Sequence, residues 1–112
     1  MRFLIIIPAH NEEGNLPFTL DSLQQQSCKD FKVVVVNDGS TDRTAEMIRK
    51  YTETDSRFET INLQKSEHHP GSKVVHAFKN GLQTQAMDEF DIICKFDADI
   101  ILPENYLTAV EK

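Results

Sequence analysis

Two aspartates stand one residue apart in the stretch CKFDADI, at residues 94–100. If the chain stays extended past residue 96, Asp97 and Asp99 face one ligand while Ala98 faces away, because side chains alternate along a strand. A diphosphate brought to about 5 Å would meet roughly 3 kcal/mol of repulsion per charge pair at an effective dielectric of about 20. Mg²⁺ or Mn²⁺ removes this repulsion by binding carboxylates and phosphate oxygens together. The spacing therefore predicts a metal that holds a phosphate ester, although such a pair alone also occurs at ordinary turns.

The composition fits one compact domain. The chain has 112 residues, of which 39% are hydrophobic, enough for one core and too few for two domains. A formal net charge of -6 argues against a nucleic-acid partner. The first apolar run is too short to be a signal peptide or a membrane span. Cys28 and Cys94 lie in unlike settings without metal-site spacing, so we expect reduced thiols and a cytoplasmic protein, with attachment to the inner face of the membrane left open for a longer chain.

Apolar runs alternate with helical patterns along the chain. Runs without polar alternation, typical of parallel strands covered on both faces, occupy residues 3–7, 33–36 and 92–96, and an alternating run that suits a sheet edge occupies residues 58–63. Four stretches have apolar residues at helical spacing. The first has Leu16, Leu20 and Leu23, and the second covers residues 45–51, with Ser40, Thr41 or Asp42 as its cap. The third has Val74, Phe78 and Leu82, and the last has Leu107 and Val110, with Pro103 in its first turn. This βαβαβαβα order predicts an α/β fold, a Rossmann-like three-layer sandwich whose mostly parallel sheet has strand order 3-2-1-4.

Ligands of such sheets bind beyond the carboxyl ends of the strands, near the point where the strand order reverses. Three predicted strands end there in polar and acidic residues, at positions 8–13, 37–40 and 97–99. The glycine-rich phosphate-binding signatures G-x-G-x-x-G and G-x-x-x-x-G-K-[ST] are absent from the sequence. A metal-bridged phosphate is therefore the interpretation that fits this edge.

Three stretches together resemble one known family: IIIPAHNEE at residues 5–13, VVVVNDGSTD at residues 33–42 and FDADI at residues 96–100. They are similar, in order and interval, to the N-terminal nucleotide-sugar-binding half of family 2 glycosyltransferases of the GT-A fold. The resemblance covers essentially the whole chain. It implies an enzyme of hexosyltransferase type that moves a sugar, with inversion and metal assistance, from a nucleotide-diphospho-sugar to an acceptor hydroxyl. The donor it implies is a UDP-sugar.

The resemblance also implies roles for individual residues. Asp38 hydrogen-bonds the base, Gly39 permits a tight turn, and Asp99 binds the metal between the phosphates. Residues expected to line the donor site or to approach the phosphates are Pro8, Ala9, His10, Asn11, Glu12, Lys73, Asp97 and Ala98. Asp97 meets either the ribose or, as a second ligand, the metal. His10 stands where many members have tyrosine, and it fits either a simple turn or a contact with the base. Lys95 either pairs with one of the aspartates or extends to the surface.

The resemblance places the general base after the last motif, in an acceptor-binding half. We therefore expect residues 1–112 to be the sugar-donor half of a larger domain, inactive alone, with the catalytic base beyond Lys112 and a glycan or lipid-linked acceptor bound by the missing half. Two other functions stay open. One is a sugar nucleotidyltransferase, for which the acidic stretch at residues 8–13 is unfavourable, and the other is a non-catalytic α/β regulatory module with acids at its strand ends.

Overall fold

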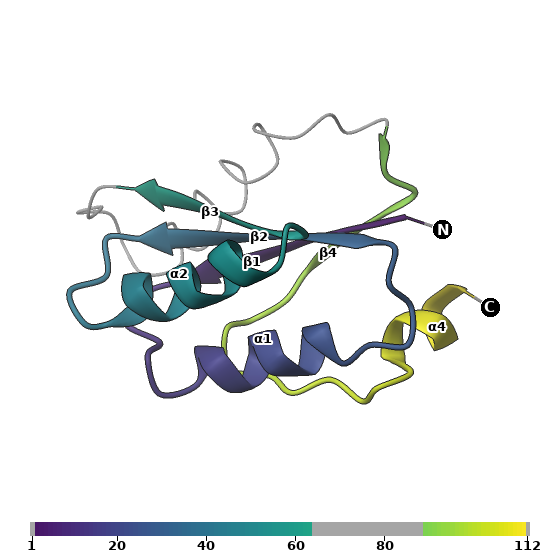
Figure 1. Cartoon of the computed structure of the whole chain (residues 1–112), viewed down its shortest axis with the longest axis horizontal. Coiled ribbons are helices and arrows are strands. Elements are labelled where there is room, and N and C mark those ends of the chain that lie inside the picture. Colours follow the sequence, from purple (N-terminus) through teal and green to yellow (C-terminus); the bar gives the residue numbers. More distant parts are fainter. Residues whose placement is uncertain (1, 64–88, 112) are drawn as a thin grey trace.

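The computed structural model describes residues 2–63 and 89–111, and its centre is a four-stranded parallel sheet (Figure 1). The strands are β1 (Phe3–Ala9), β2 (Phe31–Asp38), β3 (Phe58–Leu63) and β4 (Ile92–Lys95). Their order across the sheet is β3-β2-β1-β4, and each neighbouring pair is parallel. The predicted α/β fold and the strand order 3-2-1-4 are therefore confirmed.

Three helices accompany the sheet in the described part of the chain: α1 (Leu16–Gln24), α2 (Thr44–Thr54) and α4 (Tyr106–Glu111). Figure 1 shows α1 and α2 on one face of the sheet. The stripe predicted at Val74, Phe78 and Leu82 lies outside the described residues. No helix within the described ranges has the length and apolarity that a membrane span needs.

The start of the last helix corrects one prediction. Pro103 was expected in its first turn, but α4 begins at Tyr106, whose N–H donates to the Pro103 carbonyl at 3.1 Å. The carbonyl of Glu104 accepts the N–H of Ser27, in the segment that follows α1, at 2.8 Å. Residues 103–105 thus form a connection between two elements and not a helical turn.

Both faces of β1 and β2 are buried, which explains why their apolar runs lack polar alternation, whereas β4 is covered less completely than its sequence predicted, with Ile93 40% exposed. On the helix side, alternate residues of β1 and β2 join one core cluster with the apolar stripe of α1, namely Phe3, Ile5, Ile7, Ala9, Phe31, Val33, Val35, Leu16, Leu20 and Leu23. On the other side, Leu4, Ile6, Val34 and Val36 form a second cluster. A slip of one residue in either strand would exchange the two sets of side chains between the faces.

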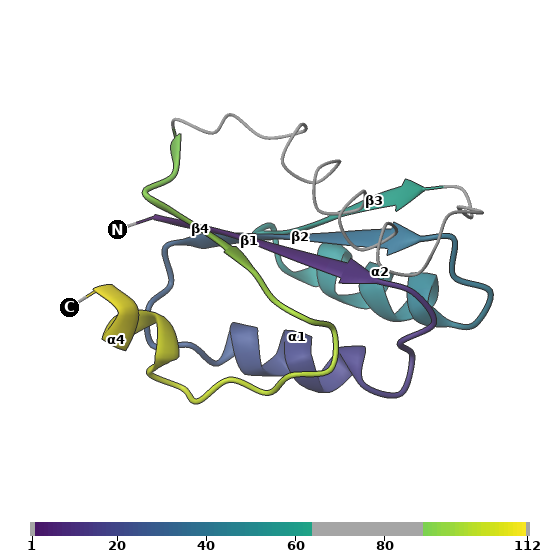
Figure 2. The same cartoon turned by 180° about the vertical axis from the view of Figure 1, so that it is seen from behind.

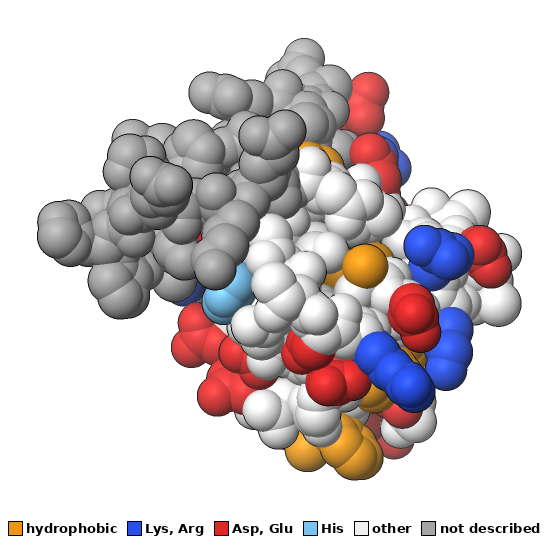
Figure 3. Space-filling model, turned by 90° about the vertical axis from the view of Figure 1, so that its left-hand side faces the viewer, with side chains coloured by type: hydrophobic (Ala, Val, Ile, Leu, Met, Phe, Trp, Pro, Cys, Tyr) orange, Lys and Arg blue, Asp and Glu red, His pale blue; other side chains and the backbone are white. Residues whose placement is uncertain are grey.

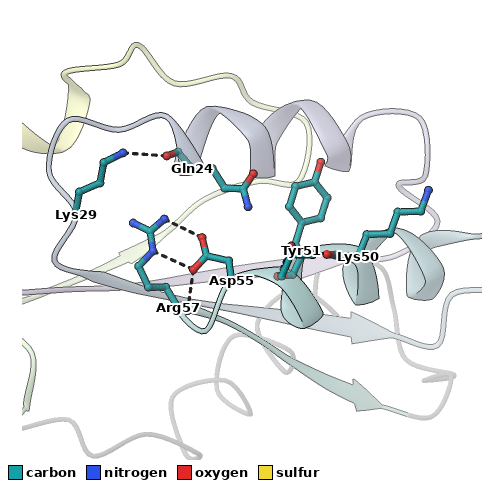
Figure 4. A network of polar contacts seen from close by, with 7 residues as sticks. Gln24, Lys29, Lys50, Tyr51, Asp55 and Arg57 are labelled. Atoms are coloured by element: carbon teal, nitrogen blue, oxygen red, sulfur yellow. Dashed lines mark hydrogen bonds and ion pairs between the residues drawn. The ribbon is translucent and has the colours of Figure 1, made fainter.

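A polar network closes the edge where the strands begin (Figure 4). Arg57 binds both carboxylate oxygens of Asp55, with Nε at 3.1 Å and a terminal nitrogen at 2.8 Å, and its guanidinium lies 4.4 Å from the ring centre of Phe31. The hydrogen bonds from Arg57 hold the pKa of Asp55 below its usual range. Nearby, Lys29 donates to the carbonyl of Gln24 at 3.1 Å. These contacts stabilise the edge where the strands begin.

Candidate functional site

The carboxyl ends of β1 and β2 lie side by side, with Ala9 in register with Asn37. Figure 3 looks onto this edge, and exposed acidic side chains gather around it. The segment that follows β4 leaves the same edge, because β4 pairs in parallel with β1. The polar ends of β1 and β2 therefore meet as the sequence predicted, whereas β4 stops at Lys95, in register with Ile6 and before the end of β1.

Asp38, the last residue of β2, carries an unusual oxygen. The residue is only 4% exposed, and its Oδ1 atom is buried without a hydrogen-bond partner among the described residues. A buried acceptor in that state costs free energy, and native proteins leave few of them. An ionised carboxylate accepts hydrogen bonds and donates none, so this oxygen suits a ligand that presents an N–H or O–H group.

His10 is held against the end of β2. Its Nδ1 atom lies 2.6 Å from the backbone carbonyl oxygen of Asp38. A carbonyl only accepts, so Nδ1 carries the proton, and Nε2 is an acceptor in the neutral ring. Gly39 follows with φ 61, the left-handed conformation that glycine adopts without strain, and this agrees with the predicted tight turn.

Asn11 connects the loop after β1 to the loop after β2. Its backbone has φ 53, and its N–H donates to the hydroxyl oxygen of Ser40 at 3.0 Å. Its side-chain Oδ1 accepts the N–H of Thr41 at 2.8 Å. Asparagine tolerates this backbone conformation better than most residues. The side chain of Asn11 is therefore occupied with the neighbouring loop, about thirty positions further along the chain.

Two more contacts tie these loops together. The N–H of Glu12 donates to the Thr44 hydroxyl at 2.9 Å, and the N–H of Glu13 donates to Asp42 Oδ2 at 3.4 Å. Asp42 Oδ1 also accepts the N–H of Thr44, the first residue of α2, at 2.9 Å. Of the three residues predicted to cap this helix, Asp42 is the one whose side chain accepts the N–H of Thr44. The residue directly before the helix is Arg43. Partial burial raises the pKa of Asp42, but hydrogen bonds from Thr44 and Glu13 outweigh it, and the net shift is downward.

The stretch with the two aspartates differs from the expected extended strand. β4 ends at Lys95, and the Phe96 N–H makes one further bond to the carbonyl of Ile6, after which Ala98 and Asp99 form a turn. The chain leaves the sheet here, since the last residue of β4 in register with β1 is Lys95, opposite Ile6. Burial still alternates: Ala98 is 5% exposed and joins the helix-side core, whereas Asp97 and Asp99 are exposed.

Lys95 pairs with Asp97, which answers the question that the sequence left open. Its Nζ atom lies 3.4 Å from Asp97 Oδ1, and the side chain of Asp97 is 70% exposed. Exposed pairs of this kind contribute little stability. The contact leaves Asp99 as the carboxylate of the pair that no lysine or arginine neutralises among the described residues.

The two aspartates fit a hard divalent cation. Their ligand atoms are carboxylate oxygens at the surface, and Mg²⁺ is commonly bound by one or two carboxylates together with substrate phosphates and water. Within residues 2–63 and 89–111, no group of three His, Cys, Asp or Glu side chains is arranged to hold an ion unaided. The donor set therefore fits an ion whose coordination a phosphate ligand completes.

Other predicted site residues have mixed surroundings. Pro8 is half-buried, Ala9 and Ala98 are buried in the core, and Glu12 is half-buried beside the loop contacts. Lys73 lies outside the described residues. A line of buried polar residues on α1 and just after its end was not predicted from the sequence, namely Thr19, Ser22 and Gln26. Their spacing at i, i+3 and i+7 is the signal that identifies one face of a helix.

Solved structures share this fold. The TarS protein of S. aureus, crystallised with UDP, superposes with a TM-score of 0.82 and 26% identity over 99% of this chain and 31% of that one. A mannosyltransferase from Pyrobaculum calidifontis, in complex with GDP-Man and Mn²⁺, gives a TM-score of 0.76 and 25% identity over 91% of this chain and 28% of its own. The fold and the acidic edge define a Rossmann-like α/β domain of the GT-A class.

The sequence matches the profile of glycosyl transferase family 2 over residues 4–111. This chain belongs to that family, and it corresponds to the N-terminal half that the three motifs predicted. A dolichyl-phosphate beta-glucosyltransferase of Trichomonas vaginalis is 42% identical over 74 residues, which cover 59% of this chain and 22% of that protein. Glycosyltransferase GlyA of Streptococcus pneumoniae is 41% identical over 56 residues, 50% of this chain and 8% of that protein. The chain thus spans less than a third of the relatives it matches.

Proposed function

We propose that this chain is the sugar-donor-binding part of an inverting glycosyltransferase of hexosyltransferase type that uses a UDP-sugar. Family membership supports the reaction class. Structures of TarS with UDP and with UDP-GlcNAc, both 26% identical to this chain, support the choice of nucleotide. The observation that carries the proposal is the buried Oδ1 atom of Asp38, which has no partner among the described residues at the edge where such ligands bind.

Asp38 contacts the base in this proposal. The ring N–H of uracil supplies the hydrogen that the buried oxygen of Asp38 lacks. The proposed lining of the nucleoside pocket comes from the end of β1 and the following loop, through Pro8, Ala9, His10, Asn11 and Glu12, and from Gly39. The side chain of Ala9 is buried, the side chain of Asn11 binds the neighbouring loop, and the N–H of Asn11 donates to Ser40, so we assign the contacts of these two residues with the nucleoside to their remaining backbone groups.

Asp99, with Asp97, holds Mg²⁺ or Mn²⁺ together with the diphosphate. Support comes from the exposed carboxylates and from the relative whose structure contains GDP-Man and Mn²⁺. When bound, the ion neutralises charge that develops on the departing diphosphate. Asp97 meets either the ribose or the metal, Ala98 lies between the two carboxylates as part of the donor site, and Lys73 approaches the diphosphate.

The remaining parts of the reaction belong to the whole protein. Because this chain spans 31% of the TarS structure, we place the general base and a glycan or lipid-linked acceptor site outside residues 1–112. The isolated chain then binds the donor and transfers little or no sugar. We also place the protein in the cytoplasm. Its proposed partners are nucleotide-sugars and not nucleic acid.

Calorimetric titration with UDP tests the base contact. Replacement of Asp38 by Asn exchanges an acceptor-only group for one that also donates, and it should weaken UDP binding by about tenfold or more. Asp30→Asn, at the other end of β2, is the matched control and should bind as the wild type does. Pyrophosphate should bind both variants equally, because it has no base.

Three results would contradict the proposal. Unchanged UDP affinity in Asp38→Asn would remove the base contact. Turnover of UTP with a sugar 1-phosphate would indicate a nucleotidyltransferase. Binding of acetyl phosphate without binding of UDP would indicate a regulatory module.

A further inference from the structure

A line of polar side chains on α1 and just after its end faces the segment that carries the two aspartates. Thr19, Ser22 and Gln26 are 0%, 7% and 0% exposed, although threonine, serine and glutamine are mostly surface residues. Figures 1 and 2 both show the chain after β4 running alongside α1 toward α4. Buried polar groups need partners, so this line identifies what holds the segment in place.

Thr19 holds the residue between the aspartates. Its hydroxyl Oγ1 donates to the backbone carbonyl of Ala98 at 3.1 Å, and the contact is buried. The methyl group of Ala98 packs in the same core. The peptide that joins Ala98 to Asp99 is therefore fixed from the α1 side by one hydrogen bond and one apolar contact.

The other two side chains hold the segment further on. Ser22 Oγ accepts the N–H of Leu102 at 3.1 Å. Gln26 donates to the carbonyl of Pro103 at 2.6 Å and accepts the N–H of Leu107 at 3.0 Å. These contacts lie three or more residues beyond Asp99, so they secure the path to α4 and do not touch the aspartates.

The sheet does not position the aspartates directly. β4 ends at Lys95, and the last ladder bond in this region joins the N–H of Phe96 to Ile6. The contact from Thr19 to Ala98 is thus the buried hydrogen bond that fixes the turn bearing Asp99. A ligand set for a metal depends on such outer contacts, which orient the ligands and whose loss commonly lowers metal affinity by about 10- to 100-fold.

We propose that Thr19 is a positioning residue for the metal ligands Asp97 and Asp99, an inference that rests on the proposed function. Its hydroxyl fixes the Ala98 peptide and thereby the direction in which the two carboxylates leave the chain. Without that donor the buried carbonyl lacks a partner, and the turn shifts to find another. The carboxylates then no longer present their oxygens together to a cation and a diphosphate.

The test compares UDP affinity in Mn²⁺ with UDP affinity in EDTA, and the ratio of the two is the Mn²⁺ enhancement. Thr19→Val keeps the shape of the side chain and removes the donor, so it should lower the enhancement by about tenfold. Thr19→Ser keeps the hydroxyl and should retain the wild-type ratio. Ser22→Ala removes the neighbouring contact to Leu102, so it should lower the melting temperature and leave the ratio unchanged. Affinity in EDTA should be the same in every variant.

A purely structural role for Thr19 would change the melting temperature and not the ratio. A wild-type ratio in Thr19→Val would therefore overturn the inference. If that variant does not fold, Thr19→Ala, which also lacks the donor, serves in its place with the same expected loss. If the wild-type chain binds UDP but shows no enhancement, the metal site fails and this inference fails with it. If it does not bind UDP at all, the proposed function fails.

Discussion

The ring of His10 and the backbone of Asp38 are joined across the ends of β1 and β2, with Nδ1 2.6 Å from the carbonyl oxygen. The contact uses the backbone of Asp38 and leaves its Oδ1 atom without a partner among the described residues. The histidine that stands where many family members have tyrosine thus supports the proposed base-binding residue from the adjacent strand.

Replacement of His10 by Phe tests this support. Phenylalanine keeps a ring but cannot donate to the Asp38 carbonyl, so we expect the free energy of unfolding to fall by about 1 kcal/mol. UDP affinity should fall as well, because the end of β2 is held less firmly. Urea denaturation and calorimetry measure the two quantities. Wild-type values of both would show that the contact has no role in the site.

Asn11 offers a test of the loop connection. Asn11→Gly removes the side-chain acceptor for Thr41 but tolerates φ 53, whereas Asn11→Ala removes the acceptor and also resists this backbone conformation. We therefore expect the alanine variant to be less stable than the glycine variant by about 1 kcal/mol. Denaturation at neutral pH measures the difference. Equal stabilities would mean that the left-handed conformation carries no cost here.

The ion pair of Asp55 and Arg57 predicts how stability depends on pH. The pKa of Asp55 is lower in the folded protein than its ordinary value of 3.8. This carboxylate therefore contributes stability that is fully present above its unfolded pKa and is lost as the pH falls through the folded pKa. Asp55→Asn should be less stable at neutral pH and should lose less stability on acidification. The assignment would be contradicted if the free energy of unfolding fell equally steeply with decreasing pH in the variant and in the wild type.

The fold was predictable because its signals are local. The apolar runs and their separation by helical stripes indicated parallel strands buried on both faces, as β1 and β2 are and β4 is not. Leu16, Leu20 and Leu23 are fully buried on α1 as their spacing predicted. The grouping of acidic strand ends followed from the parallel topology. These features need no knowledge of which side chains meet in space.

The missed features depend on contacts between distant segments. The bond between Asn11 and Thr41 exists only because two loops meet, and Thr19 resembles any helical threonine until Ala98 is placed beside it. The extended path expected through Asp97 depended on strand pairing, which stops at Lys95. Sequence spacing gave the identity of the proposed metal ligands, and the structure alone gave the means by which they are held.

The ion pair between Lys95 and Asp97 should make the effect of Lys95 on Mn²⁺ affinity depend on ionic strength. Its pairing with Asp97 competes with cation binding, so Lys95→Met should raise the Mn²⁺ affinity of the UDP complex by up to about fivefold. The gain should shrink in high salt, because the pair is exposed. Lys29→Met, at the opposite edge of the sheet, is the control. A lower affinity in Lys95→Met would contradict the competition and would place the lysine on the diphosphate.

The most direct test of the account is the affinity of the 112-residue chain for UDP with Mn²⁺ and with EDTA, in the wild type and in Asp99→Asn. We predict that Mn²⁺ tightens binding to the wild type by about tenfold or more, and that the substitution abolishes this gain while binding in EDTA persists. Equal UDP affinity of the wild type in both solutions would contradict the claim that a cation joins the diphosphate to this acidic edge.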